Sequence, residues 1–324
     1  MRPFPFIIFL AILSLCLIVA SLLTGSVSLS LQTVWQSLIN PGAQASSLIV
    51  TELRLPRALA AFATGALLAQ AGALMQVLVR NPLADPYILG VSGGAATAVL
   101  IGMLLGLSNS FGLSGLAFLG ALIAMFLVFA LAHQKGNWTP TRLLLTGVVI
   151  AAGWGAAISL ILTLSPSHNL HGMLFWLMGD LGYSHSLLFA FTALITGLIL
   201  SMLLSSQLNV LIRGDKLAAS LGINLHQLHL KIYILASLLT AAAVVQAGSI
   251  GFVGFIVPHL IRLTGMTDHR ILLPAATLAG GILVLLADTL ARTIIAPQQL
   301  PVGIITALIG IPLFLFLLQR DAKQ

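Results

Sequence analysis

Apolar runs long enough to cross a lipid bilayer make up most of this chain, and they constrain its fold more than any motif. A helix needs about 17–25 apolar residues to span the hydrocarbon core. With 59% hydrophobic residues, 6% charged residues and a mean hydropathy of +1.11, the chain fits no soluble globular class. We therefore predict an all-α polytopic membrane protein with a single domain over residues 1–324. Nine predicted spans lie near residues 4–23, 56–79, 88–107, 112–132, 143–164, 187–204, 230–248, 271–295 and 302–318.

A tenth apolar segment, residues 250–265, follows the seventh after a short Ala-Gly-Ser break. If it is a separate span, eleven Lys and Arg residues fall on one side of the membrane and three on the other. This is a strong positive-inside pattern, so we predict ten transmembrane helices, with both termini and the loop 207–231 in the cytosol. The inner set is Arg2, Arg80, Lys135, Arg142, Arg213, Lys216, Lys231, Arg262, Arg270, Arg320 and Lys323, and the outer set is Arg54, Arg57 and Arg292.

The first span is longer than the apolar region of a secretory signal, so we interpret it as a retained anchor. It contains the chain's one cysteine, Cys16, which excludes a disulfide framework or a thiolate metal site within the chain. The net charge of +7 comes from residues in the predicted cytosolic loops. It therefore indicates membrane orientation rather than nucleic-acid binding.

The loop 207–231 is the longest polar insertion between apolar segments. Asp215 is placed to N-cap a short helix over residues 216–221, and Gly222 is placed to supply a left-handed stop. Asn224 is placed to N-cap a second short helix that starts at Leu225. The loop therefore predicts two short helices that meet at a corner.

Each of these two helices carries an apolar stripe, which a simple connector does not need. One interpretation is an amphipathic loop that rests on lipid headgroups or folds back onto its own bundle. The other is a docking site for a cytosolic partner. The stripe residues are Leu217, Ala218 and Leu221 in the first helix and Leu225 and Leu228 in the second.

A rigid turn is predicted after the second span. In Arg80-Asn-Pro-Leu-Ala-Asp-Pro86 two prolines interrupt the helix, and a Gly-rich run at 89–94 starts the next one. A Gly-rich helix start can bind phosphate, but this one lacks the lysine of a phosphate-binding loop and lies in a span. We therefore interpret it as a packing feature, in keeping with the many small residues of the second span.

The positions of the acidic residues limit the chemistry of the chain. Of its seven acids, only Asp288 lies within a predicted span, and Arg292 follows four residues later, a spacing that allows an ion pair along one helix. The missing intramembrane carboxylate relay argues against an ion-coupled secondary transporter, which is the alternative from another class. No phosphate-binding loop of the Gly-x-x-x-x-Gly-Lys-Ser/Thr type is present either. If the chain pumps a substrate, the energy must come from another polypeptide.

The outer loop 165–185 contains several potential metal ligands. His168 and His171 could face the same way on a helix and bind a metal ion. We interpret them instead as solvated loop residues, the more common situation for a histidine in a loop.

Several motifs follow one another in an order that is highly specific. They are Arg54-Leu-Pro-Arg57, Arg80-Asn-Pro-Leu-Ala-Asp-Pro86, Leu89-Gly-Val-Ser-Gly-Gly94, Gly251-Phe-Val-Gly254, Pro258-His-Leu-Ile-Arg262, Asp268-His-Arg270, Ala287-Asp288 with Arg292, and Leu300-Pro-Val-Gly303. Together they resemble the FecCD/BtuC-type permeases, the membrane subunits of bacterial ATP-binding-cassette importers for iron-siderophores, haem and cobalamin. The similarity covers most of the chain, from about residue 50 to 320.

The resemblance implies a BtuC-like, type II importer fold with ten helices per chain, working as a homodimer with the path along its two-fold axis. It implies two cytosolic ATPase subunits, which bind ATP and Mg²⁺, and a periplasmic substrate-binding protein. This chain itself would bind no cofactor, no metal and no nucleic acid. The implied function is import of a metal-chelate nutrient, either cobalamin, a ferric siderophore or haem, across a bacterial inner membrane by alternating access.

The same resemblance gives expected roles to individual positions. The region 214–228 matches paired coupling helices that sit in a cleft of the ATPase, and the span 142–164 matches the helix that lines the path. One departure is the inner gate, where family members can have two adjacent small hydroxyl residues and this chain has Pro140-Thr141. The coupling residues are Asp215, Leu217, Ala218, Leu221, Gly222, Leu225 and Leu228, and the path or gate residues are Pro140, Thr141, Arg142, Gly147, Gly153 and Trp154. The arginines that would receive glutamates of the binding protein are Arg54, Arg57 and Arg292, and the structural-motif residues are Arg80, Asn81, Pro82, Asp85, Pro86, Pro258, His259 and Arg262.

Overall fold

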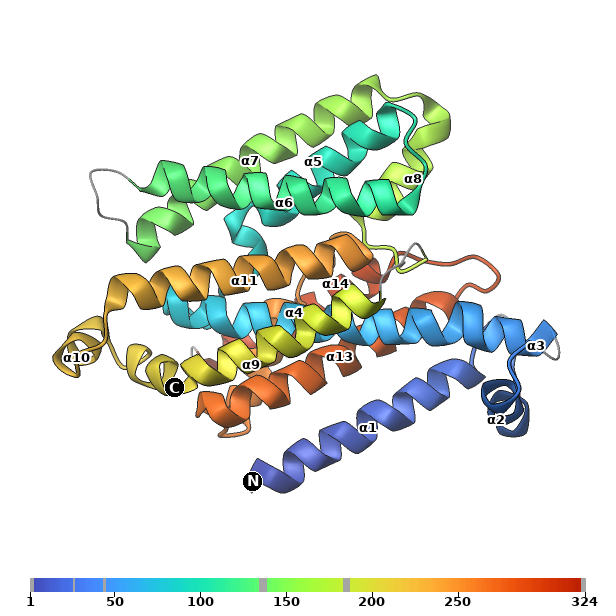
Figure 1. Cartoon of the computed structure of the whole chain (residues 1–324), viewed down its shortest axis with the longest axis horizontal. Helices are drawn as coiled ribbons and strands as arrows, with labels where there is room; N and C mark the ends of the chain where they lie inside the picture. Colours follow the sequence, from blue (N-terminus) through green and yellow to red (C-terminus); the bar gives the residue numbers. More distant parts are fainter. Residues whose placement is uncertain (1–2, 26, 43–44, 134–138, 183–186, 322–324) are drawn as a thin grey trace.

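A computed structural model shows a bundle built from helices (Figure 1). It describes residues 3–25, 27–42, 45–133, 139–182 and 187–321, and within these residues it contains no strand. Three of the basic residues in the charge count, Arg2, Lys135 and Lys323, lie outside the described residues.

The helix bounds follow the apolar segments closely. The long helices are α1 (Pro3–Leu23), α4 (Leu55–Val79), α6 (Ser110–Ala132), α7 (Pro140–Leu164), α9 (Leu187–Leu211), α11 (Leu225–Ala247) and α13 (His269–Thr293). The remaining apolar helices are α5 (Val91–Leu104), α12 (Val253–Leu263) and α14 (Val302–Asp321). The small elements are α2 (Leu31–Ile39), α3 (Ala45–Leu48), the π-helical η1 (Ile49–Arg54), the 3₁₀ turn η2 (Pro86–Leu89), α8 (Ser167–Leu177) and α10 (Asp215–Ser220).

Seven helical stretches of the described chain are long and apolar enough to cross a membrane, the one containing α4 starting at Ala45. The apolar parts of α5, α12 and α14 are shorter. The predicted division of residues 230–265 into two helices is confirmed, because α11 ends at Ala247 and α12 begins at Val253. Gly248 makes the break, with a positive φ of 66°. The number of spans remains a prediction.

α4 is the centre of the bundle, and α1, α9, α11, α12 and α13 pack around it (Figure 1). Every residue from Ala63 to Leu78 is buried. A Cβ at Gly65 would overlap the carbonyl oxygen of Gly280 on α13, and one at Gly72 would overlap that of Gly254 on α12. The close helix approach predicted from the small residues is therefore confirmed, with backbones in direct contact.

The two ends of the bundle differ in their small elements. α10 lies at one end together with the end of α9 and the start of α11, whereas α2, α3 and α8 lie at the opposite end (Figure 1). The start of α1 and the end of α14 lie toward the α10 end (Figure 1), and the side of the membrane on which the termini lie stays a prediction. We call the α10 end the inner end and the α8 end the outer end.

The structure corrects two predictions for the loop 207–231. Asp215 does not N-cap α10, because Gly214 takes the non-helical cap conformation with φ 129°, and Asp215 becomes the first helical residue. The second helix is not short, because the helix that starts at Leu225 continues through the following apolar residues to Ala247. Asn224 does cap it as predicted, since its side chain accepts the backbone N–H of Gln227 at 3.1 Å.

Candidate functional site

α10 presents an apolar surface at the inner end. Leu217 and Leu221 are 43% and 62% exposed, whereas Ala218 and Leu228 are buried, at 0% and 1% exposed. The predicted stripe therefore divides into inner residues that hold α10 on the bundle and two leucines that protrude, while Leu225 is half-buried. Two protruding leucines on a short helix suit insertion into an apolar cleft of another protein.

A Schellman motif fixes the corner between α10 and α11. The N–H of Gly222 donates to the carbonyl of Ala219, and the N–H of Ile223 donates to that of Ala218, both at 3.0 Å. Gly222 has a φ of 80°, as predicted for a left-handed stop. No atom lies within 4 Å of the position that its Cβ would take. Glycine is therefore favoured here for its backbone conformation and not for lack of space.

An ion pair attaches α10 to the end of α4. Nη2 of Arg80 contacts Oδ1 of Asp215, and Nε2 of His229 on α11 lies 3.7 Å from the same oxygen. Arg80 is the C-cap of α4 and adopts the left-handed conformation, with φ 53° and ψ 36°. Asp215 therefore joins α4, α10 and α11.

The turn over residues 80–90, which contains η2, is held by its own side chains. Oδ1 of Asn81 accepts the N–H of Leu83 at 2.9 Å, and Oδ1 of Asp85 accepts the N–H of Tyr87 at 2.8 Å. Its two prolines fix φ at two more positions. Burial raises the pKa of Asp85 to about 6, although the hydrogen bond from Tyr87 opposes this shift. The turn is rigid, as predicted.

η2 touches α7 through the backbone. A Cβ at Gly147 would come within 2.6 Å of the carbonyl oxygen of Ile88, so only glycine fits at this contact. Trp154, about two α-helical turns further along, covers the turn at Gly90 and the start of α5 at Gly93. Gly153 differs, since no atom lies within 4 Å of its Cβ position. Of the predicted path residues, Gly147 and Trp154 thus contact the 80–90 turn.

α7 begins at Pro140, the position at which a helix best tolerates proline. The side chain of Thr139 N-caps the helix and accepts the N–H of Arg142 at 3.3 Å. Thr141 and Arg142 are both exposed. Pro140 therefore defines a helix start at the inner end, and the predicted gate beside it stays a prediction.

Most of the apolar surface of α7 is uncovered in the single chain. Leu145, Val148 and Val149 are 62%, 52% and 70% exposed. In water such a face would be costly, but lipid or a second protein can cover it.

Polar contacts also join the segments around α12 at the inner end. Nη1 of Arg262 contacts Oε1 of Gln76 on α4, and Nε2 of Gln76 donates to the carbonyl of Phe255 at 2.9 Å. Pro258 and His259 are buried within α12. Of the predicted motif residues of α12, Arg262 therefore attaches this helix to α4 through Gln76.

Asn209 near the end of α9 holds the start of α13. Its Nδ2 donates to Oδ1 of Asp268 at 2.7 Å, and its Oδ1 accepts the N–H of His269 at 2.9 Å. Asp268 itself N-caps α13. The inner ends of α9 and α13 are therefore tied together.

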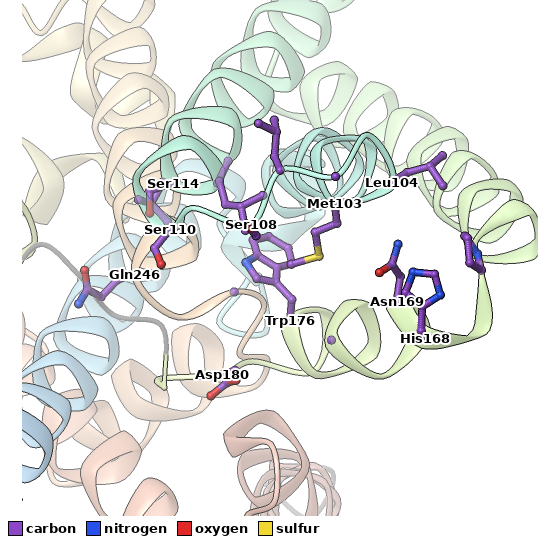
Figure 2. Close-up of a pocket in the computed structure, with 18 residues that line it drawn as sticks. Met103, Leu104, Ser108, Ser110, Ser114, His168, Asn169, Trp176, Asp180 and Gln246 are labelled. Atoms are coloured by element: carbon purple, nitrogen blue, oxygen red, sulfur yellow. The ribbon is translucent and has the colours of Figure 1, made fainter.

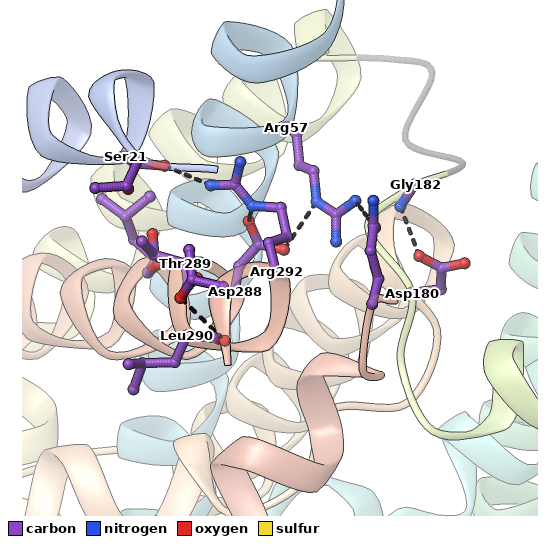
Figure 3. Close-up of polar contacts among 12 residues, drawn as sticks. Ser21, Arg57, Asp180, Gly182, Asp288, Thr289, Leu290 and Arg292 are labelled. Carbon is purple, nitrogen blue, oxygen red and sulfur yellow. Dashed lines mark hydrogen bonds and ion pairs between the residues drawn. The ribbon is translucent and has the colours of Figure 1, made fainter. Parts of the chain in front are cut away.

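A buried charge cluster occupies the outer end. Asp288 on α13 is 0% exposed; its Oδ1 lies 2.9 Å from Nε of Arg57 on α4, and its Oδ2 lies 3.0 Å from Nε of Arg292 (Figure 3). Nη2 of Arg292 donates to Oγ of Ser21 on α1 at 2.8 Å. The pair predicted between Asp288 and Arg292 is confirmed. The cluster also includes a second arginine, Arg57, from another helix, α4.

Arg54 is nearly buried, at 6% exposed. Its Nη1 donates to the carbonyl of Leu22 at 2.7 Å, and its Nη2 contacts that of Val27, so it holds the chain after α1. Together with Arg57 and Arg292 it lines a recess of about 300 Å³. All three outer arginines therefore have partners inside the chain, and their role in docking a binding protein stays a prediction.

A second recess at the outer end, of about 490 Å³, lies between α8, the loop after α5 and the end of α11 (Figure 2). Its lining includes Asn169 and Trp176 on α8 and Met103 on α5. Gln246 on α11, which also lines it, is 4% exposed, and its Nε2 has no hydrogen-bond partner among the described residues. The lining of this recess combines polar side chains, such as Ser110 and Gln246, with apolar ones, such as Met103 and Trp176 (Figure 2).

His168 and His171 lie on α8 rather than in a loop, which corrects the loop part of that interpretation, whereas both residues are exposed, as predicted. His168 lines the recess, whereas the ring of His171 packs on Phe175 with centroids 4.5 Å apart. No group of three metal-ligating side chains occurs within the described residues. His185, which belongs to the same predicted loop, lies outside them.

Known proteins show the same pattern over nearly the whole chain. The model of the FecCD transport family matches residues 12–320. The chain belongs to this family. Hemin transport system permease protein HmuU of Yersinia pestis is 42% identical to this FecCD-family chain over 323 residues, covering 98% of the chain and 96% of HmuU. Vitamin B12 import system permease protein BtuC of Salmonella typhi is 39% identical over 322 residues, covering 96% and 95%.

Solved structures agree. A metal-chelate type ABC transporter in an inward-facing conformation superimposes on this FecCD-family chain with a TM-score of 0.85 at 33% identity, covering 98% of this chain and 99% of the other. PsaBC from Streptococcus pneumoniae has a TM-score of 0.57 at 15% identity and shows the fold alone. The FecCD permease is therefore a multi-pass inner-membrane component of an ATP-binding-cassette importer.

Sequence reasoning on this permease missed the contacts between distant segments. Arg57 and Asp288 are 231 residues apart, and no local pattern pairs them. The motif that contains Arg80 predicts a packing role, whereas the side chain of Arg80 contacts Asp215. A signal was available for the helix caps, since Thr139 precedes Pro140 and Asp268 precedes an apolar run.

Proposed function

We propose that this chain is the permease subunit of an ATP-driven importer that carries a metal-chelate nutrient into the cytoplasm by alternating access. The observation that carries the proposal is a pair of protruding leucines, Leu217 on α10 and Leu221 at its C-cap, on a helix that is ion-paired to the rest of the bundle. A loop that only connected two spans would not need both features. A cytosolic ATPase subunit would receive this surface in an apolar cleft.

A second copy of the chain would cover α7. The uncovered face of this helix includes Val148 and Val149, beside Gly153 with its open surroundings. Two such faces opposed across a two-fold axis would form a path with apolar walls and few specific contacts. The substrate would then be selected mainly by a periplasmic binding protein, which the recess lined by Arg54, Arg57 and Arg292 would help to seat through charge.

The names of two relatives suggest the substrate class. HmuU is named for hemin and BtuC for vitamin B12. Hemin and vitamin B12 are both large metal macrocycles. We therefore propose a metal macrocycle or a similarly large chelate as the cargo of this chain.

An ion-coupled secondary transporter is the alternative, and the position of Asp288 argues against it. This carboxylate is buried within α13, and two arginine side chains engage it. A coupling carboxylate must gain and lose its ion during each cycle, which two bound guanidinium groups oppose.

The test is reconstitution of the full complex. The permease, its cognate ATPase and its cognate binding protein are placed in vesicles, and uptake of hemin and of cyanocobalamin is measured with ATP on the ATPase side. We expect ATP-dependent uptake of one of these probes and none with a non-hydrolysable analogue. Uptake driven by an ion gradient without nucleotide would instead support the secondary transporter.

A labelling experiment tests the orientation. Cys16 is the one cysteine, so a Cys16→Ser background leaves single introduced cysteines as the labelling sites. In intact cells a membrane-impermeant maleimide should leave Leu217→Cys unlabelled and label Leu31→Cys on exposed α2. The reverse pattern would overturn the assignment of the inner end to the cytosol.

A further inference from the structure

The 80–90 turn forms a physical connection between α10 and α7. At one end, Arg80 contacts Asp215, the first residue of α10. At the other end, the carbonyl of Ile88 lies directly against the backbone of α7 at Gly147.

The middle of this turn has little internal freedom. Three backbone hydrogen bonds close it, from Ala84 to Asn81, from Ile88 to Asp85 and from Gly90 to Tyr87. The side chains of Asn81 and Asp85 add two more, and its prolines fix the backbone on either side. A displacement of Arg80 would therefore move η2 as a unit rather than be absorbed within the turn.

The turn also contacts the break between α11 and α12. The hydroxyl of Tyr87 accepts the N–H of Ile250 at 3.0 Å, and a Cβ at Gly254 would come within 2.6 Å of the ring of Pro86. η2 therefore lies against both α7 and the segment that starts α12.

The backbone conformation of Arg80 indicates that its side chain has a role. The C-cap position at φ 53° is one that glycine adopts without strain and that other residues rarely adopt. The pair with Asp215 does little to offset that strain, because both side chains are partly exposed, at 38% and 42%, and such pairs contribute little to stability. A strained residue with a weakly stabilising contact is better explained by function than by stability.

We propose that Arg80 is a positioning residue for coupling, and that the Arg80–Asp215 pair transmits the displacement of α10 through the 80–90 turn to α7. This inference rests on the proposed function, in which an ATPase displaces α10. Asp215 then moves with α10, Arg80 follows the carboxylate, and η2 pushes or releases α7 through the contact at Gly147.

The decisive variant is Arg80→Gly. Glycine keeps the left-handed cap and relieves its strain, so the fold and the assembled complex should survive while the ion pair is lost. We expect ATP hydrolysis to stay within about twofold of wild type and the substrate carried per ATP to fall about fivefold or more, the range of a typical coupling free energy. Asp215→Asn should reproduce the loss, and Arg80→Lys should restore part of it.

The double variant and a matched control separate coupling from general damage. If the two residues act as a pair, Arg80→Gly with Asp215→Asn should be no worse than either change alone. Arg270 is an exposed cation at the same end and contacts neither Arg80 nor Asp215. Arg270→Ala should therefore leave the ratio of substrate transported to ATP hydrolysed unchanged.

The same vesicles distinguish two kinds of failure, with hemin and cyanocobalamin as probes. If wild-type vesicles show no ATP-driven uptake of either compound, the metal-macrocycle cargo of the proposed function is wrong. If wild type transports and both Arg80→Gly and Asp215→Asn keep its ratio of transport to hydrolysis, the coupling role of Arg80 is wrong. A lower melting temperature with an unchanged ratio would also overturn it and leave the pair a purely structural contact.

Discussion

Asp288 on α13 accepts a hydrogen bond from Arg57 on α4, with Oδ1 and Nε 2.9 Å apart. The carboxylate is 0% exposed, and its second oxygen faces Arg292. One anion therefore serves two cations, and it joins the central helix to the helix packed most closely against it. The cost of burying these charges is offset only while all members of the cluster are present.

The first prediction concerns removal of that anion. Asp288→Asn leaves two nearly buried guanidinium groups without a counter-charge, and we expect a loss of about 3–5 kcal/mol in stability. Thermal unfolding of the purified permease in detergent measures this loss. Asp180→Asn, in a partly exposed outer loop, is the control and should change little. An unchanged melting temperature for Asp288→Asn would contradict the structural role of the cluster.

Much of the fold could be predicted because its signals are local. An apolar run predicts a helix, and a stretch rich in proline and glycine predicts a turn. Asn224 predicts a helix cap because its hydrogen bond reaches only three residues along the chain, to Gln227. Asp215 was misplaced by one residue because Gly214 competes for the cap position and needs no side chain to take it. Boundaries that depend on backbone conformation alone leave a weak trace in the sequence.

The polar contacts could not be predicted in the same way. Motifs in the sequence identify the residues at the candidate sites. The partners of these residues depend on which helices pack against one another. Arg57 was expected to face outward, and its pairing with Asp288 follows from the packing of α4 on α13 at Gly65 and Gly280. The partner of Arg80 likewise depends on where α10 folds back. Such pairs are set by tertiary packing, which hydrophobic patterns do not specify.

A second prediction tests the docking role of the outer arginines. Arg57→Gln should weaken association with the binding protein at low salt, and the difference should shrink at high salt because ions screen the attraction. Binding is measured at two salt concentrations on vesicles with matched permease content. Arg270→Gln, at the opposite end, should have no effect. Equal affinity of Arg57→Gln and wild type at low salt would remove Arg57 from the interface.

A third prediction uses the titration of Asp85. Its folded pKa is about 6, whereas an unperturbed aspartate has a pKa of about 3.9. The folded state therefore binds the proton more tightly, so stability is highest at low pH and falls as the pH rises from about 4 to about 6. Asp85→Asn keeps a side chain that can cap η2 but removes this dependence. Unfolding midpoints across that range check it, and parallel slopes in the two proteins would show that another group titrates.

The fourth prediction concerns the protruding leucines. Leu217→Asp or Leu221→Asp would place an unpaired charge in a desolvated contact with the ATPase, at a cost of several kcal/mol. We expect the complex to dissociate or uncouple while the permease itself stays folded, because both side chains face away from the bundle. Leu217→Met is the matched control. Ala218→Asp should instead unfold the α10 region, because Ala218 is 0% exposed. Normal ATPase binding by both leucine variants would favour a surface that rests on lipid.

The last prediction separates the angle of the corner from its contact surface. Gly222→Val removes no contact, since nothing lies near the Cβ position, but a β-branched residue at φ 80° is strained by about 1–3 kcal/mol. The strain would loosen the Schellman motif and change the angle between α10 and α11. We expect the ATPase to remain bound and to hydrolyse ATP while uptake is lost. Gly222→Asn, which tolerates the left-handed conformation, should retain uptake. If uptake is normal in Gly222→Val and also in the two leucine-to-aspartate variants, the segment from α10 to the start of α11 is a passive connector.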